Sequence, residues 1–101
     1  MNISRKKNKD TTTLIFEGDL TIYCVTQVKD ELFADYEKMA DKIALDLSSV
    51  GEIDTAGVQL LLFAKKFFAS VRRPLFITKS NESVESVLTA LDVSTQFALE
   101  S

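Results

Sequence analysis

The chain has 101 residues, a length that suits one domain with a single core and is too short for a multidomain enzyme. Hydrophobic residues make up 46% of it and charged residues 27%, a composition typical of a globular protein and not of a disordered one. The net charge of −3 gives no general attraction to nucleic acid or to an anionic membrane, and no apolar run approaches the roughly 20 residues of a membrane-spanning helix.

Residue types that usually carry catalysis or bind metals are scarce. The sequence has no histidine, which removes the commonest general base and the commonest metal ligand. Cys24 is its single cysteine, which excludes an internal disulfide and fits a reducing compartment, and we expect it to be a small core residue. Residues 1–10 are basic but lack the apolar core of a signal peptide. We therefore expect a cytoplasmic protein without a metal or cofactor.

The first segments predict a β-hairpin. Residues 2–6 are compatible with a weak strand, residues 7–10 with a charged turn, and residues 11–17 with a second strand that ends at Gly18, because this segment is rich in β-branched and aromatic residues. Four basic side chains surround the turn, and we interpret them as a solvated rim and not as a nucleic-acid-binding arm, because the rest of the chain is acidic. They are Arg5, Lys6, Lys7 and Lys9.

The next segment predicts an amphipathic helix. Asp19 and Thr21 are its candidate N-caps. Apolar residues then recur at helical spacing as far as residue 39 and define one buried face. They are Val25, Val28, Leu32, Tyr36 and Met39.

Residues 43–58 carry the strongest pattern. Residues 43–45 are a continuous apolar run, typical of a strand covered on both faces, and residues 48–51 have the Ser and Gly composition of a tight polar turn. Asp54 stands directly before a helical run that extends to about residue 70, where its carboxylate is placed to accept hydrogen bonds from the first turn. Thr55 is then the first helical residue. Its hydroxyl lies at the positive end of the helix dipole, where an added phosphate is well tolerated.

Gly57 lies inside the first turn of this predicted helix, although glycine is about 1 kcal/mol less favourable than alanine there. We infer that something approaches the backbone closely at this position. At about 100° per residue, the apolar residues gather on one broad core face and leave a surface stripe beside it. The stripe indicates either a docking patch or a helix that is buried more than half way round. It consists of Thr55, Gln59, Leu62, Phe63 and Lys66.

The rest of the chain adds one strand and one helix. Residues 72–74, Arg-Arg-Pro, end the long helix, residues 75–78 predict a strand, and residues 80–82 open a last helix. Its apolar face is expected to contain Val84, Val87, Leu88 and Leu91, and residues 93–99 close the chain as a short edge strand or a helical turn. The order β-β-α-β-α-β-α predicts an α/β fold with a mixed sheet of four to five strands and helices packed on it.

Two short motifs resemble the signature of the STAS family, the domain shared by sulfate transporters and anti-sigma factor antagonists. They are Asp46-Leu47-Ser48 and Ile53-Asp54-Thr55-Ala56-Gly57-Val58. The resemblance extends from about Leu14 to Phe97 and implies a single STAS-like domain over residues 1–101. In the family the Ser or Thr directly after the second Asp is the phosphoacceptor, so the resemblance implies that Thr55 is phosphorylated.

The resemblance implies a cytoplasmic protein–protein interaction switch of the anti-sigma factor antagonist kind, controlled by phosphorylation of Thr55. Its partner would be an anti-sigma factor or a related ATP-binding Ser/Thr kinase-like regulator, and the protein itself a monomer or weak homodimer. The predicted partner interface consists of Asp19, Thr21, Ser49, Asp54, Thr55, Gly57, Gln59, Leu62, Phe63 and Lys66.

Two other functions compete with this hypothesis. A Thr acceptor and Gln59, where sporulation-type and stress-type antagonists usually have glycine, resemble STAS proteins attached to transporter ATPases or chemotaxis operons. The alternative is therefore a constitutive, unphosphorylated scaffold subunit of such a complex. An enzyme is the third possibility, since the carboxylates Asp46, Glu52 and Asp54 are close in sequence. No nucleophile–base pair or phosphate-binding glycine-rich loop accompanies them, so we expect no catalytic residue and no enzyme activity.

Overall fold

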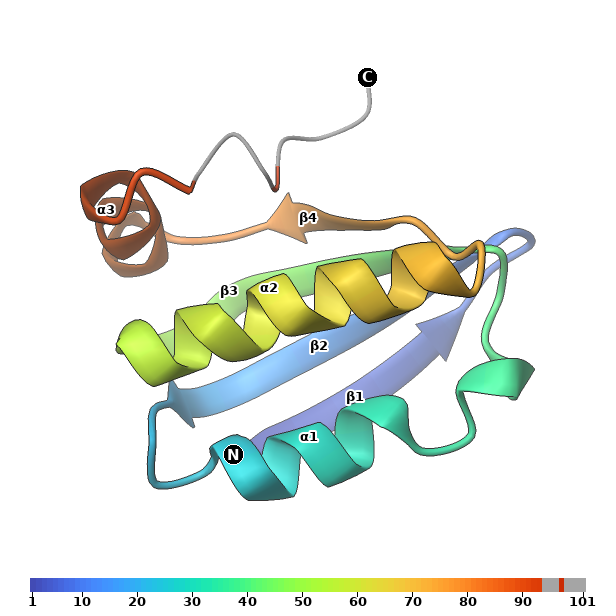
Figure 1. Cartoon of the computed structure of the whole chain (residues 1–101), viewed down its shortest axis with the longest axis horizontal. Coiled ribbons are helices and arrows are strands. Elements are labelled where there is room, and N and C mark those ends of the chain that lie inside the picture. The colour runs from blue at the N-terminus through green and yellow to red at the C-terminus, as the bar shows by residue number, and fades with distance from the viewer. Residues whose placement is uncertain (94–96, 98–101) are drawn as a thin grey trace.

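One mixed sheet of four strands organises the described part of the chain, residues 1–93 and residue 97 of a computed structural model (Figure 1). The strands are β1 (Asn2–Lys7), β2 (Thr11–Leu20), β3 (Lys42–Ile53) and β4 (Leu75–Lys79), and they lie side by side in this order. β1 is antiparallel to β2, whereas β2, β3 and β4 are parallel to one another. The predicted α/β fold with a mixed sheet is confirmed.

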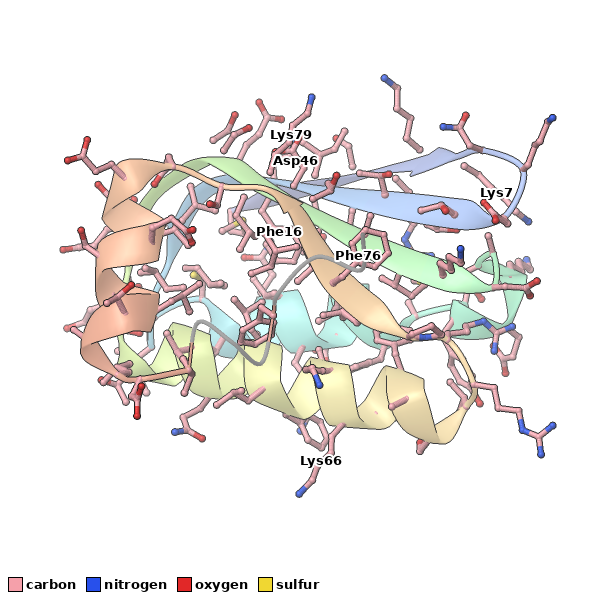
Figure 2. All side chains as sticks on the ribbon, turned by 90° about the horizontal axis from the view of Figure 1, so that it is seen from above. Lys7, Phe16, Asp46, Lys66, Phe76 and Lys79 are labelled. Atoms are coloured by element: carbon pink, nitrogen blue, oxygen red, sulfur yellow. The ribbon has the colours of Figure 1, made fainter. Side chains whose placement is uncertain are left out.

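Two helices cover one face of the sheet, and a third lies across its end. α1 (Val25–Phe33) and α2 (Thr55–Ser70) run side by side on the covered face, and α3 (Glu82–Ala90) follows β4. Figures 1 and 2 show α3 at the end of the sheet where α2 begins. Apart from a short 3₁₀ helix, η1 (Tyr36–Lys38), the element order is the predicted one. No helix in the described residues is long and apolar enough to cross a membrane.

The core lies between the sheet and the helices α1 and α2. Phe16 on β2 and Leu45 on β3 point into it and are fully buried, and Phe16 is seen there in Figure 2. From the other side α2 contributes Leu61 and Phe68, also fully buried. The α2 residues follow the predicted helical spacing, and buried residues alternate with half-buried ones in the first part of β2, because each element has one face that packs on the core.

Residues 48–51 form part of a strand and not the expected turn. β3 continues without a break to Ile53 because β2 continues beside it to Leu20, past Gly18, with register shifts between residues 15 and 17 and between residues 18 and 20. On its other edge β4 has ended, and the Asn81 amide donates instead to the carbonyl oxygens of residues 47, 48 and 50 at 3.4, 3.2 and 2.8 Å. The end of β3 is therefore irregular, with β2 on one side and the Asn81 amide on the other.

The helix expected over residues 25–39 is shorter than its apolar pattern. α1 ends at Phe33, and Asp35 adopts the left-handed conformation with φ +51° before η1 begins. Tyr36 and Met39 nevertheless pack on the core, which is why the helical spacing continues past the end of the helix. Neither Asp19 nor Thr21 caps α1, whose N-cap residue is Cys24; its thiol makes no capping hydrogen bond to the helix and donates to the Asp19 carbonyl oxygen at 2.9 Å instead. Cys24 is half-buried and packs against the core, as expected.

The ends of the chain add three details. Arg5 on β1 donates to the carbonyl oxygens of Glu31 and Ala34, both at 2.8 Å, and so satisfies the C-terminal end of α1. The predicted solvated rim therefore has a structural role as well. Leu91, expected on the buried face of the last helix, lies beyond α3 and is 40% exposed. Most of the segment expected at residues 93–99 lies outside the described residues. Phe97, which is described, is buried.

Candidate functional site

Asp54 joins the start of α2 to the loop between β2 and α1. Its Oδ1 accepts a hydrogen bond from the backbone N–H of Gly57 at 2.9 Å, which confirms it as the N-cap. Its Oδ2 accepts from the backbone N–H of Ile22 at 3.0 Å. The hydrogen bond from Gly57, and after it that from Ile22, keeps the pKa of Asp54 below its ordinary value. A single carboxylate thus positions both the helix and the loop formed by residues 21–24.

Gly57 is buried where α2 packs against the end of β2. A Cβ at this position would overlap the carbonyl oxygen of Leu20 and lie 3.0 Å from the Leu20 Cγ. The same Leu20 oxygen accepts a hydrogen bond from the backbone N–H of Asp54 at 3.3 Å. The close approach inferred from the sequence is therefore made by the chain itself. Gly57 is buried and positions α2, so it offers a partner little surface, and its place in the interface stays a prediction.

Thr55 is exposed at the first position of α2, directly after the N-cap residue Asp54. Gln59, Phe63 and Lys66 are exposed further along the same helix, and Leu62 is half-buried. Figure 2 shows Lys66 extending away from the body of the protein. The stripe predicted from helical spacing is therefore present on the surface of α2.

Phe63 is the main apolar group of this stripe, with 48% of its surface exposed. Its ring is held edge-on against Phe33 of α1, with 5.6 Å between the centroids and 82° between the planes. The ring stands between two shallow hollows, one of about 350 Å³ between α1 and α2 and one of about 550 Å³ along α2. A rigid aromatic side chain beside open hollows is a suitable contact for a protein partner.

The other predicted interface residues belong to β2, to the loop after it and to β3. Asp19 Oδ1 accepts from the backbone N–H of Glu52 at 3.0 Å and so fastens the end of β2 to the end of β3. Thr21 is half-buried in the loop that Asp54 holds. Ser49 is exposed on β3, opposite Glu17 of β2, and is not part of the α2 stripe.

The three carboxylates that are close in sequence do not come together as one metal-binding cluster. Asp46 lies on the sheet face opposite to the helices, near Lys79 (Figure 2). Its Oδ1 accepts from the hydroxyl and the backbone N–H of Ser48 at 2.6 and 3.0 Å. Glu52 is exposed at the end of β3, whereas Asp54 caps α2. Among the described residues, no group of three potential metal ligands comes together.

Sequence reasoning missed two residues of the loop beside Asp54. Ile22 is 60% exposed and Tyr23 96% exposed, immediately before α1. They are exposed because the loop is held by its backbone, through the N–H of Ile22, and their side chains are left outside. The one signal in the sequence is the absence of a helical or strand period in residues 18–24, which does not tell which side chain points outward.

A mixed sheet with two helices on one face is a fold that solved structures share. SpoIIAA, an anti-sigma factor antagonist, has this fold in its unphosphorylated form (TM-score 0.76, 15% identity, 99% of this chain and 88% of that chain). The phosphorylated form of SpoIIAA from Bacillus has it too (TM-score 0.69, 14% identity, 99% and 91%). A candidate anti-sigma factor antagonist from Thermotoga maritima is similar at 26% identity (TM-score 0.81, 92% and 80%).

The family model described as Mlab, STAS domain matches residues 3–100. The chain therefore belongs to the STAS domain family, as its two short motifs predicted. No curated protein sequence matches it significantly.

Proposed function

We propose that this protein is an interaction switch whose partner binds around the start of α2 and senses whether Thr55 carries a phosphate. One observation carries the proposal: the Thr55 hydroxyl is exposed on a helical turn that Asp54 and Gly57 fix against the neighbouring loop and strand. Because the helix start is held in place, a partner surface can contact this hydroxyl in one fixed geometry. Support comes from family membership and from the similarity to SpoIIAA, which exists in both phosphorylation states.

The physical effect of the phosphate would be local. It adds roughly −1.5 to −2 charges and three acceptor oxygens at the positive end of α2. Thr55 is exposed, so the added group enters solvent and not the core. The exposed carboxylates of Asp19 and Glu52 at this end of the sheet would repel it, and the fold would survive. A partner surface that fits a neutral hydroxyl would instead meet a bulky anion and be released without a rearrangement of this domain.

The proposed partner is an anti-sigma factor or a related ATP-binding Ser/Thr kinase-like regulator, and the proposed location is the cytoplasm. This part rests on the anti-sigma factor antagonists among the similar structures. The protein would act by binding and not by catalysis.

A constitutive scaffold subunit of a transporter ATPase or chemotaxis complex is the second candidate, and a specific observation favours it. The exposed Phe63 lies eight residues beyond Thr55, about 12 Å along the helix, and one of its two hollows extends from there to Ala69. A partner seated mainly on Phe63 would remain bound whatever the state of Thr55.

The test uses the full chain as bait in extract of its native host, as wild type, Thr55→Ala and Thr55→Glu. Thr89→Ala and Thr89→Glu serve as controls, because Thr89 is an exposed threonine on α3. We expect Thr55→Ala to retain a partner that Thr55→Glu loses, the Thr89 variants to behave as wild type, and mass spectrometry to find phosphate on wild-type Thr55. Equal capture by all baits with no phosphate would refute the switch and support the scaffold.

A further inference from the structure

We propose that the hollow between α1 and α2 binds an amphipathic helix of the partner, with carboxylates at the end of that helix that lies over Lys29 and Lys66. The inference rests on the proposed function and specifies the chemistry of its partner. It is carried by the apolar surface around Phe63 and by the distribution of charge along that surface.

Exposed apolar side chains belong to the segments beside the hollow, an arrangement that suits a helix. Tyr23 and Ile22 stand exposed before α1, and Phe63 stands exposed on α2 at the far end of the hollow that Val25, Thr26 and Ala56 line. From Thr55 to Lys66 the surface of α2 is about 16 Å long, which corresponds to three turns of a partner helix. Side chains at positions i, i+3 or i+4, and i+7 of such a helix would fill the hollows on the two sides of Phe63.

Lysines surround Phe63, although the whole chain has a net charge of −3. Lys29 Nζ lies 5.4 Å from the centre of the Phe63 ring, and Lys65 and Lys66 line the hollow on its other side. Among the described residues that line the two hollows, none is acidic. Asp30, the next residue of α1, is exposed but lines neither hollow.

The opposite end of the same surface is acidic. Asp54, Asp19 and Glu52 lie around the start of α2, and the last two are exposed. The surface is therefore bipolar, with lysines at one end and carboxylates at the other. Charge complementarity fixes the direction of the bound helix, with its own carboxylates over the lysines and none over Asp54.

The inference can be tested with a phage-displayed library of random 16-residue peptides selected on the full-length wild-type protein. Synthetic copies of the enriched peptides are then titrated by fluorescence anisotropy. The test variants are Phe63→Ala and the double variant Lys29→Glu/Lys66→Glu. The matched controls are Leu91→Ala, an exposed apolar residue after α3, and Lys9→Glu/Lys38→Glu, two exposed lysines that line neither hollow.

We expect enriched peptides with apolar residues at helical spacing and carboxylates clustered at one end. Their Kd should rise at least about fivefold with Phe63→Ala, and more with the lysine reversal, while both controls stay within about twofold. Affinity should also fall as salt rises. The inference is wrong if no peptide is enriched, if the enriched peptides are basic or uncharged, if Phe63→Ala binds them normally, or if sedimentation shows that a second copy of the protein occupies this surface.

The same peptides separate this inference from the proposed switch. Binding that depends on Phe63 and the lysines but ignores Thr55→Glu would keep the helix site and remove the switch. A host partner that responds to Thr55→Glu but ignores Phe63→Ala and the lysine reversal would keep the switch and overturn the helix site.

Discussion

Asp54 offers the sharpest test of how the site is built, because its two carboxylate oxygens serve two different elements. Alanine at this position removes the cap on the Gly57 N–H and the acceptor of the Ile22 N–H together. Loss of an N-cap costs about 0.5–2 kcal/mol, and the second hydrogen bond adds little because the carboxylate is solvent-screened. We therefore expect Asp54→Ala to reduce the free energy of unfolding by about 1–2 kcal/mol, or roughly 5–10 °C in Tm.

Asparagine at the same position separates the two roles. Its side chain still presents one oxygen to the Gly57 N–H and remains a good cap, but its NH₂ group cannot accept from Ile22. Asp54→Asn should therefore lose only a few tenths of a kcal/mol in a urea titration, while amide exchange at Ile22 and Tyr23 becomes faster. If Asn costs as much as Ala, or if exchange in the loop is unchanged in both variants, the carboxylate does not hold the loop.

The stability difference between wild type and Asp54→Asn should depend on pH in one direction. The pKa of Asp54 is lowered in the folded protein by the hydrogen bonds from Gly57 and Ile22. The stability it contributes is therefore complete above its ordinary pKa of 3.8 and is lost as pH falls through the lower folded pKa. The stability difference between wild type and Asp54→Asn should be constant from neutral pH to about pH 5 and shrink below pH 3.8. A difference that persists unchanged at pH 2 would contradict this assignment.

Three further substitutions test the packing that supports the site. Gly57→Leu should unfold the protein, and not merely obstruct a partner, because even a Cβ overlaps the Leu20 carbonyl oxygen; a cooperative circular-dichroism melt near that of wild type would contradict this. Asn81→Ala removes a cap hydrogen bond of 2.9 Å and the donor to three β3 carbonyls. We therefore expect the free energy of unfolding, measured in urea, to fall by about 2–3 kcal/mol. A fall of under about 1 kcal/mol would mean that water replaces the amide. Thr12→Val should cost about 1–3 kcal/mol in the same titration because the buried Thr12 Oγ1 accepts from the Ala40 N–H at 2.8 Å, and an unchanged midpoint would show that this N–H finds another acceptor.

Local signals in the sequence determined α2 and its cap. The predicted start at Thr55, the end near residue 70 and the capping role of Asp54 all agree with the structure, because each depends on residues within a few positions of one another. The same holds for the element order and for the exposed stripe of α2, which follow from hydrophobic periodicity.

Tertiary structure alone decided what surrounds that helix. Residues 48–51 form strand and not turn, because β2 and Asn81 supply hydrogen-bond partners from distant parts of the chain. The apolar spacing of residues 25–39 extends past the end of α1, since residues in a loop and a 3₁₀ turn can bury side chains on the same core. The exposure of Tyr23 and the burial of Gly57 depend on how β2, its following loop and α2 meet. The period of apolar residues in the sequence indicates which side chains are buried. Only the long-range pairing of the backbone determines which surfaces lie next to one another.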